Sequence, residues 1–172
     1  MFADAVGYSR LTEIQIPLFF QHYVGAIARF NKATEHQAMH VETAGDGMYM
    51  VFEDASTAGH YALDLMDTLN RQDWQSRGLP KDLGTRIGLH CGPVFAGQDP
   101  ITGKPLFSGV HTNRTARIEP ITPPGQVYAS SPFASVATAQ GVTGLRFSYI
   151  GRTQLAKDYG VLPLYHVKRQ GY

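Results

Sequence analysis

The amino-acid sequence predicts an α+β fold in which helices cover one face of a mostly antiparallel sheet. Two apolar, strand-like runs flank the pair Asp46-Gly47, a dipeptide typical of a tight hairpin turn. Apolar residues also recur at helical spacing over residues 16–30 and again over residues 58–69. A short apolar run around Asp4 precedes the first of these stretches, so the elements read strand, helix, strand, strand, helix.

Size and composition favour one domain, residues 1–172. A chain of 172 residues with 43% hydrophobic and 17% charged content can form a core that folds without disulfides or structural metals. The formal charge of +1 excludes the broad basic surface of a nucleic-acid-wrapping protein. The single Cys91 excludes an internal disulfide, and its apolar neighbours indicate a packed strand residue in a reducing compartment. Without a transmembrane run or signal peptide, we expect a soluble, cytoplasmic domain with no membrane contact.

The first half of the chain has clear boundaries between its elements. Residues 7–9 predict a tight turn, after which a long amphipathic helix begins. Glu42 and residues 48–52 lie in the two hairpin strands, and Ser56 is the expected N-cap of the second helix. The inner positions of the two helices are Ile16, Phe20, Val24 and Ile27, then Ala58, Ala62, Leu65 and Leu69.

In the second half, residues 85–91 and 94–96 are expected to form a strand pair broken at Gly92-Pro93. A polar loop rich in Gly and Pro covers residues 98–105. A helix over about residues 111–118 should end at Glu119-Pro120, because a residue before proline disfavours helical geometry.

The last third alternates short elements. A turn at residues 123–125 leads into a strand over residues 126–129, and a short helix starts near Ser131 with Pro132 in the first helical position. Residues 147–150 and 164–167 are the final strands. The complete order predicts a ferredoxin-like βαββαβ core.

Two carboxylates stand where strands end. The hairpin turn holds Asp46 beyond both of its strands, and Asp4 follows an apolar run. Two oxygen ligands from separate strands suit Mg²⁺ or Mn²⁺. The simpler interpretation is a capping aspartate at position 4 and an ordinary hairpin aspartate at position 46.

Several motifs, in this order, resemble the class III nucleotidyl (adenylate/guanylate) cyclase catalytic domain. Residues 2–9 resemble its first metal motif, residues 42–46 its second, and residues 86–92 its central strand. Gly109, Asn113, Ala116 and Arg117 match its transition-state helix, and residues 124–128 match the strand that follows. The match covers nearly the whole chain.

The resemblance implies a lyase that converts a nucleoside triphosphate to a 3′,5′-cyclic nucleotide and pyrophosphate. The ribose 3′-oxygen attacks the α-phosphorus. Asp4, Asp46 and the backbone carbonyl of Ala5 would hold two Mg²⁺ or Mn²⁺ ions per active site. It also implies a homodimer in which each site takes metal ligands from one subunit and transition-state residues from the other, so that a lone chain is inactive.

Asn113 and Arg117 are one helical turn apart and therefore share a helix face. The resemblance assigns Arg117 to the charge developing on the α-phosphate and Asn113 to the ribose oxygen, as preorganised donors. The alternative for Arg117 is a surface salt bridge, for example to Glu119.

Backbone N–H groups of Val6, Gly7, Tyr8 and Ser9, with a helix N-terminus, would bind the β- and γ-phosphates. An ordinary strand-to-helix turn is the alternative. Lys157 resembles the triphosphate lysine of the family, although its neighbours depart from the usual glycine-rich form and a solvated surface lysine remains the alternative.

Glu42 occupies the position where the family's guanylyl cyclases carry glutamate and its adenylyl cyclases carry lysine. A carboxylate accepts from guanine N1–H and the exocyclic amine but repels the adenine N1 acceptor, so the substrate favoured is GTP. Leu106 falls on the second base-reading position and cannot donate to guanine O6. ATP, UTP and CTP therefore stay open as substrates.

Two other function classes fit the residues less well than an active cyclase does. A degenerate domain that only binds nucleotide or partners usually lacks one of the four key groups, all of which are present. Palm-type polymerases and diguanylate cyclases use two-metal carboxylates on a related sheet, but the diguanylate signature is missing. His90 is assigned no chemistry, since no second histidine stands at ligand spacing. We expect the output domain of a bacterial signalling protein whose regulatory domain lies outside this chain.

Overall fold

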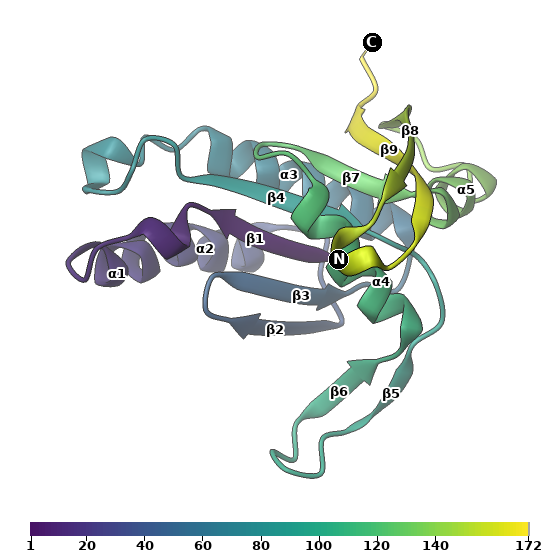
Figure 1. The fold of residues 1–172 in the computed structure, drawn as a ribbon, viewed down its shortest axis with the longest axis horizontal. Helices are drawn as coiled ribbons and strands as arrows, with labels where there is room; N and C mark the ends of the chain where they lie inside the picture. The colour runs from purple at the N-terminus through teal and green to yellow at the C-terminus, as the bar shows by residue number, and fades with distance from the viewer. Residues whose placement is uncertain (172) are drawn as a thin grey trace.

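A computed structural model describes residues 1–171; Tyr172, the last residue of the expected domain, lies outside the described residues. Seven strands form the main sheet in the order β2-β3-β1-β4-β7-β9-β8 (Figure 1). They are β1 Phe2–Val6, β2 His40–Ala44, β3 Gly47–Val51, β4 Gly84–Leu89, β7 Val127–Ser130, β8 Leu145–Gln154 and β9 Val161–Arg169. Strands β4 and β7 run parallel and the other neighbours run antiparallel, which confirms the predicted α+β class.

The first four strands, in the order β2-β3-β1-β4, and the helices between them form the predicted ferredoxin-like core. The helical elements are α1 Gln15–Leu18, η2 Phe19–Val24, α2 Gly25–Ala33, α3 Ala55–Asn70, α4 Val110–Ile118 and α5 Ser131–Ala139. Helices α2 and α3 lie behind the sheet in Figure 1, and α4 lies in front of it. We call the α4 side the open face.

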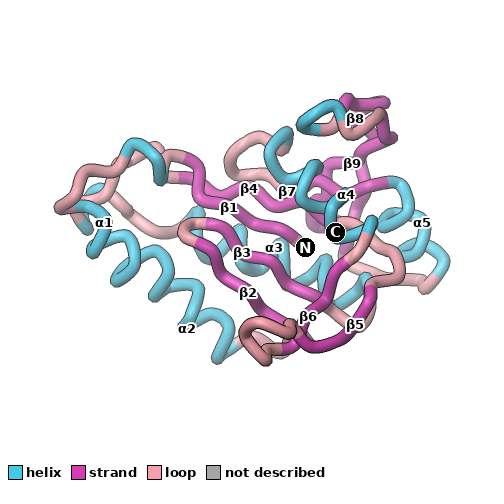
Figure 2. Tube along the Cα trace, turned by 60° about the horizontal axis from the view of Figure 1, so that its bottom comes forward, coloured by secondary structure: helices cyan, strands magenta, loops and turns pink. Residues whose placement is uncertain are grey.

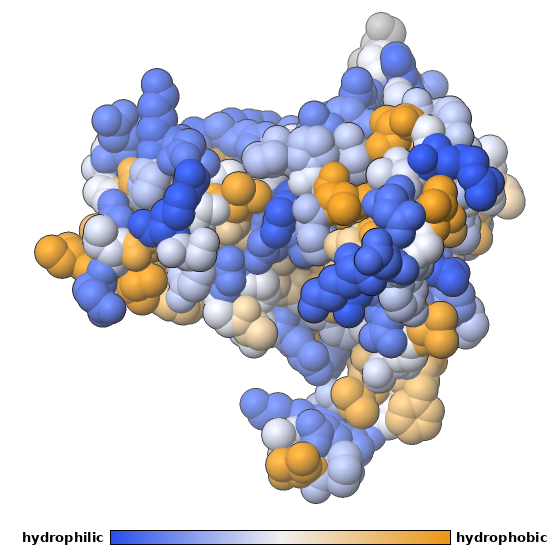
Figure 3. Space-filling model, in the orientation of Figure 1, coloured by the Kyte–Doolittle hydropathy of each residue, from blue (hydrophilic) through white to orange (hydrophobic). Residues whose placement is uncertain are grey.

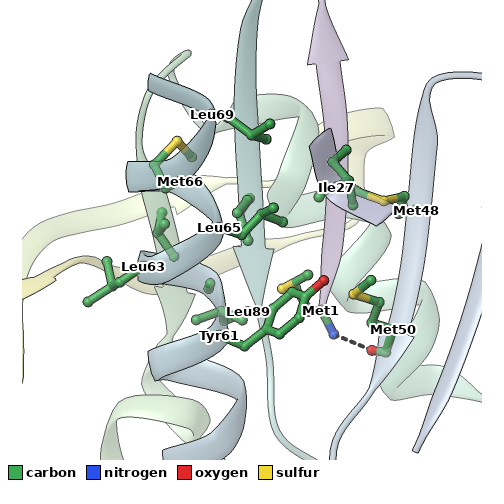
Figure 4. Packing of buried hydrophobic residues seen from close by; sticks show 14 of the residues in the cluster. Met1, Ile27, Met48, Met50, Tyr61, Leu63, Leu65, Met66, Leu69 and Leu89 are labelled. Carbon is green, nitrogen blue, oxygen red and sulfur yellow. Dashed lines mark hydrogen bonds between the residues drawn. The ribbon is translucent and has the colours of Figure 1, made fainter. Parts of the chain in front are cut away.

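Strand alternation divides side chains between the two faces of the sheet. In β1, Ala3 and Ala5 are buried in the main core, whereas Asp4 is half-buried on the open face. Met50 of β3 is fully buried, and Tyr61 and Leu65 of α3 approach the sheet from the helix side (Figure 4). The helix layer therefore supplies the core and leaves the opposite side chains of the same strands available for a site.

The long first helix is continuous from Gln15 to Ala33, but its middle, Phe19–Val24, has π-helical hydrogen bonding. The predicted N-cap of the second helix was wrong. Asp54, not Ser56, accepts from the backbone N–H of Thr57, 2.8 Å away. Both are residue types that favour this position, so the sequence pattern alone could not choose between them.

The predicted pairing of residues 85–91 with 94–96 was also wrong. Both edges of β4 are already occupied, by β1 and β7. Strand β5, Phe95–Gln98, pairs instead with β6, Pro105–Ser108, so the ends of the expected 98–105 loop are strand residues. This two-stranded arm projects away from the sheet (Figure 1) and carries apolar atoms near its tip (Figure 3).

Three smaller expectations are confirmed only in part. The hairpin turn is Gly45-Asp46, with Gly45 at φ 61, rather than Asp46-Gly47; a type II′ turn places glycine at this first central position. Helix α4 ends at Ile118 as expected, but Glu119 keeps helical backbone geometry and begins the 3₁₀ turn η4, Glu119–Ile121, despite Pro120. Cys91 packs against the core and is half-buried, as expected, but it lies just beyond the end of β4 and is not a strand residue.

Other boundaries agree more closely. Helix α5 begins at Ser131 as expected, with Ser130 as its N-cap, but Pro132 occupies the second helical position rather than the expected first. The last two strands, β8 and β9, are longer than the short runs that the sequence suggested. Within residues 1–171, no helix combines the length and the apolar character needed to cross a bilayer.

Asp54→Ala should lower the free energy of unfolding by about 1 kcal/mol, because the cap of α3 is lost. Ser56→Ala is the matched control and should change it by less than about 0.5 kcal/mol. The Thr57 N–H lowers the pKa of Asp54, so the cap stabilises at neutral pH and its contribution disappears as pH falls through that lowered value. Urea unfolding followed by circular dichroism measures both variants, and a larger loss for Ser56→Ala would contradict the assignment.

Candidate active site

Strand pairing brings the two predicted metal ligands together. Asp4 of β1 lies directly opposite Gly47, the residue that follows Asp46. A Cβ atom on Gly47 would lie 3.8 Å from Asp4 Oδ1, so the carboxylate of Asp4 reaches the hairpin end. Partial burial, followed by the charge of Asp4, raises the pKa of Asp46 to about 6. The two carboxylates are thus close enough to repel each other.

Arg86 of β4 is a site residue to which the sequence interpretation gave no role. Its Nη2 donates to Asp4 Oδ2 at 2.8 Å, its Nε donates to Glu119, and its Nη1 donates to the carbonyl of Pro120 at 3.2 Å. Burial would lower the pKa of Arg86, but Glu119 and Asp4 together raise it. The contact between Arg86 and Asp4 arises because the two residues are paired across β1 and β4. No local sequence motif predicts this contact.

Glu119 is buried at the start of η4 and pairs with Arg86 rather than with Arg117. Burial, and then the charge of Asp4, raise the pKa of Glu119 to about 7, against the opposing effect of Arg86. The alternative interpretation of Arg117 as the salt-bridge partner of Glu119 is therefore not what the structure shows.

Oxygen atoms at this place fit a hard divalent cation. The carboxylates of Asp4 and Asp46 converge, and a cation between them would relieve their mutual repulsion. Ala5, whose carbonyl was the third expected ligand, is buried in β1 beside Asp4. Among residues 1–171, no group of three His, Cys, Asp or Glu side chains forms a closed metal cluster. Open coordination positions are what a site that also binds phosphate needs.

Helix α4 carries Asn113 and Arg117, one turn apart, as predicted. Asn113 is exposed and Arg117 is half-buried, with its guanidinium carbon 6.0 Å from the ring centre of Tyr159. Arg117 Nε is buried and has no hydrogen-bond partner among the described residues. A buried guanidinium N–H without an acceptor is costly, so this group is suited to an incoming anion.

Lys157 is exposed in the 3₁₀ turn η5, Ala156–Asp158, which contacts α4. Its backbone is left-handed, with φ 58 and ψ 38, and Asp158 follows at φ 52. Consecutive left-handed residues other than glycine are strained, and such strain clusters at functional sites. The segment that presents Lys157 also supplies Tyr159 beneath Arg117.

The expected phosphate segment, residues 6–9, does not lead directly into an α-helix. Gly7 has φ 101, which favours glycine, and residues Tyr8–Arg10 form the short 3₁₀ turn η1. Helix α1 begins only at Gln15. The backbone turn of Val6, Gly7, Tyr8 and Ser9 beside Asp4 is therefore present, but the α-helix N-terminus expected there is not.

The two expected base-reading positions line one groove of about 790 Å³ between β2 and the β5–β6 arm. Glu42 lies on the β2 wall and Leu106 on the β6 wall, although 64 residues separate them in the sequence. His40 Nε2 lies 3.0 Å from Glu42 Oε1. The groove thus has Glu42 on its β2 wall and Leu106 on the arm wall, which also carries Asp99 and Lys104.

His90 belongs to a hydrogen-bonded chain that the sequence did not predict. Its Nδ1 lies 2.6 Å from Ser130 Oγ, and its Nε2 lies 2.9 Å from His111 Nδ1. Burial lowers the pKa of His90 to about 4, so the ring is neutral at physiological pH. A Cβ on Gly92 would overlap the His111 ring, which explains the glycine there. The chain ties the first turn of α4 to the end of β4.

Comparisons with known proteins agree with this geometry. The family model for the adenylate and guanylate cyclase catalytic domain matches residues 1–161. Guanylate cyclase 2G of Mus musculus is 29% identical over 153 residues, which are 81% of this chain and 14% of that protein. An adenylate cyclase of Neurospora crassa is 28% identical over 109 residues, covering 54% of this chain and 5% of that protein. The chain spans only 5 to 15% of the length of the curated relatives it matches.

Solved structures show the same fold. An adenylate cyclase of Trypanosoma brucei in its monomeric state superposes with a TM-score of 0.82 at 17% identity, covering 96% of this chain and 85% of that one. The guanylate cyclase domain of RhGC from Catenaria anguillulae, in complex with GTP, gives a TM-score of 0.73 at 20% identity, covering 99% and 94%.

Arg86→Met should lower the free energy of unfolding by about 2 kcal/mol at pH 8, because Asp4 and Glu119 lose their shared cation. At pH 5 the loss should be smaller. The raised pKa of Glu119 means that its neutral form is favoured in the fold, so stability is retained at low pH and lost as pH rises through about 7.

Urea unfolding at the two pH values measures this difference. Adding Glu119→Gln to Arg86→Met should recover part of the loss at pH 8, because one unpaired charge is removed. Equal losses at pH 5 and pH 8 would contradict the role given to Glu119.

Proposed function

The chain belongs to the family of adenylate and guanylate cyclase catalytic domains, and on this premise we propose that it converts a nucleoside triphosphate, preferably GTP, to a 3′,5′-cyclic nucleotide and pyrophosphate. One observation carries the proposal. Asp4 and Asp46, which are 42 positions apart, converge at the open end of β1 and the β2–β3 hairpin. A nucleoside triphosphate substrate also favours a cytoplasmic location.

Asp4, Asp46 and the carbonyl of Ala5 are the groups that would hold two Mg²⁺ or Mn²⁺ ions. When bound, these ions would activate the ribose 3′-hydroxyl and neutralise triphosphate charge. Arg86 supports the arrangement because its bond to Asp4 fixes that carboxylate in β1. The turn at residues 6–9 presents backbone N–H groups beside the same end of the strand.

Asn113 and Arg117 are proposed to stabilise the transition state. Arg117 is half-buried, its Nε has no acceptor among the described residues, and its guanidinium carbon lies 6.0 Å from the ring centre of Tyr159, so we assign this group to the α-phosphate oxygen. Asn113, one turn earlier and exposed, would orient the ribose oxygen. Lys157 would bind the triphosphate from the adjoining turn.

We propose that the active form is a homodimer whose sites combine Asp4 and Asp46 of one subunit with Asn113 and Arg117 of the other. The β5–β6 arm supports this arrangement. Phe95 is 66% exposed and Ile101 is 93% exposed on a ribbon that extends beyond the sheet. Burial of these two side chains against a second copy would remove their apolar surface from water.

Glu42 supports GTP as the preferred substrate, because its carboxylate in the groove can accept both donors on the guanine edge. Leu106 opposite it can contact any base. The related guanylate cyclase domain solved with GTP is consistent with this preference.

Asp46→Ala should lower cyclisation by about a thousandfold or more, and Arg117→Ala by about a hundredfold. Mixing equal amounts of the two inactive chains should restore about a quarter of wild-type activity, since half the dimers are mixed and each mixed dimer has one intact site. Pyrophosphate release with Mn²⁺ measures the rate, and Arg146→Ala, an exposed arginine on β8, is the control. Activity of the mixture that does not exceed the sum of its parts would overturn the shared site.

With GTP, ATP, UTP and CTP supplied side by side, GTP should be turned over fastest. Glu42→Lys should lower the GTP rate at least about tenfold relative to ATP, because a cation repels the donors of the guanine edge. Product chromatography gives the rates, and mass spectrometry separates a cyclic mononucleotide from a dinucleotide. A strong preference of the wild type for another base would refute the GTP assignment.

A further inference from the structure

His40 makes a directed contact with the proposed base-reading carboxylate. Residues 40 and 42 are two apart on β2, so their side chains emerge on the same face of the sheet. His40 Nε2 lies 3.0 Å from Glu42 Oε1. An ionised carboxylate only accepts, so the ring nitrogen donates, and Glu42 Oε2 keeps its lone pairs for a ligand.

The imidazole is itself held in place. Its side chain is 10% exposed, whereas that of Glu42 is 50% exposed. The ring packs against Phe107 of β6, with 4.9 Å between ring centres, and edge-on to Tyr49 of β3 at 6.2 Å. Tyr49 Oη in turn lies 3.0 Å from Thr112 Oγ1 of α4. The His40 ring, which packs between β3 and β6, therefore restrains the Glu42 carboxylate. Without this hydrogen bond the Glu42 side chain would sample several rotamers.

Both residues line the groove that also contains Leu106, and Figure 2 shows the arm crossing beside the β2–β3 hairpin. A restrained carboxylate discriminates between bases more sharply than a mobile one. It meets the two neighbouring N–H donors of guanine, and it cannot rotate away from the acceptor nitrogen of adenine or cytosine.

We propose that His40 is a specificity-determining positioning residue, which selects the base by fixing Glu42 in the groove. The inference rests on the proposed cyclase function and deepens it. It assigns base choice to a pair of side chains on β2, anchored by the ring of Phe107 on the arm.

The test compares kcat/KM for the four triphosphates in His40→Leu, His40→Gln, Glu42→Gln and the double variant His40→Leu/Glu42→Gln. Leucine fills the space between Phe107 and Tyr49 but cannot donate, so the GTP-to-ATP ratio should fall about tenfold. Glutamine keeps an N–H donor and should retain most of the ratio. In the Glu42→Gln background, removing His40 should change the ratio little, because the two act as one unit.

His22→Leu, on η2 and outside the groove, is the matched control and should leave the ratio unchanged. Thermal unfolding of each variant separates a folding defect, which lowers all four rates equally, from altered selection. If His40→Leu keeps the wild-type ratios while remaining folded and active, the inference is overturned and the proposed function stands. If the wild type makes no cyclic nucleotide from any triphosphate, the proposed function is overturned, and the inference about His40 is overturned with it.

Discussion

The open face of the sheet is organised around one guanidinium. Arg86 joins β1 through Asp4, and it joins η4 through Glu119 and the carbonyl of Pro120. A planar group with several donors can satisfy acceptors from different elements at once, which a lysine could not do. Gly88, two residues further along β4, allows this packing, since a Cβ there would lie 2.8 Å from the Glu119 nitrogen. The position of α4, and of everything that it carries, follows from this junction.

Each central strand serves two purposes because its side chains alternate. Ala3 and Ala5 fill the core, while Asp4 between them faces the open side. In β4, Ile87 is fully buried against the helix layer, and Arg86 points to the opposite face. Core packing on one side thus fixes the geometry of polar groups on the other, so the site needs few contacts of its own to stay in position.

Local patterns were sufficient to place whole elements, although they misassigned the cap of α3 and the two residues of the hairpin turn. The hairpin around Asp46 and the helix face shared by Asn113 and Arg117 follow from periods of two and 3.6 residues. Patterns failed where the answer depends on distant partners. Nothing within residues 85–96 reveals that β1 and β7 occupy both edges of β4, and nothing beside Arg86 reveals its partner Glu119, 33 positions later in η4. The fold class was therefore predictable, but the electrostatic partners of the site were not.

The arm of β5 and β6 has a further consequence. A ribbon of two strands is at best marginally stable in water by itself, and this one pairs only within itself in the described residues. Its unpaired strand edges and the exposed side chains of Phe95 and Ile101 are removed from water only when another surface covers them. In water such edges can pair with the strand edges of other molecules, so the arm is a predicted site of aggregation wherever nothing covers it.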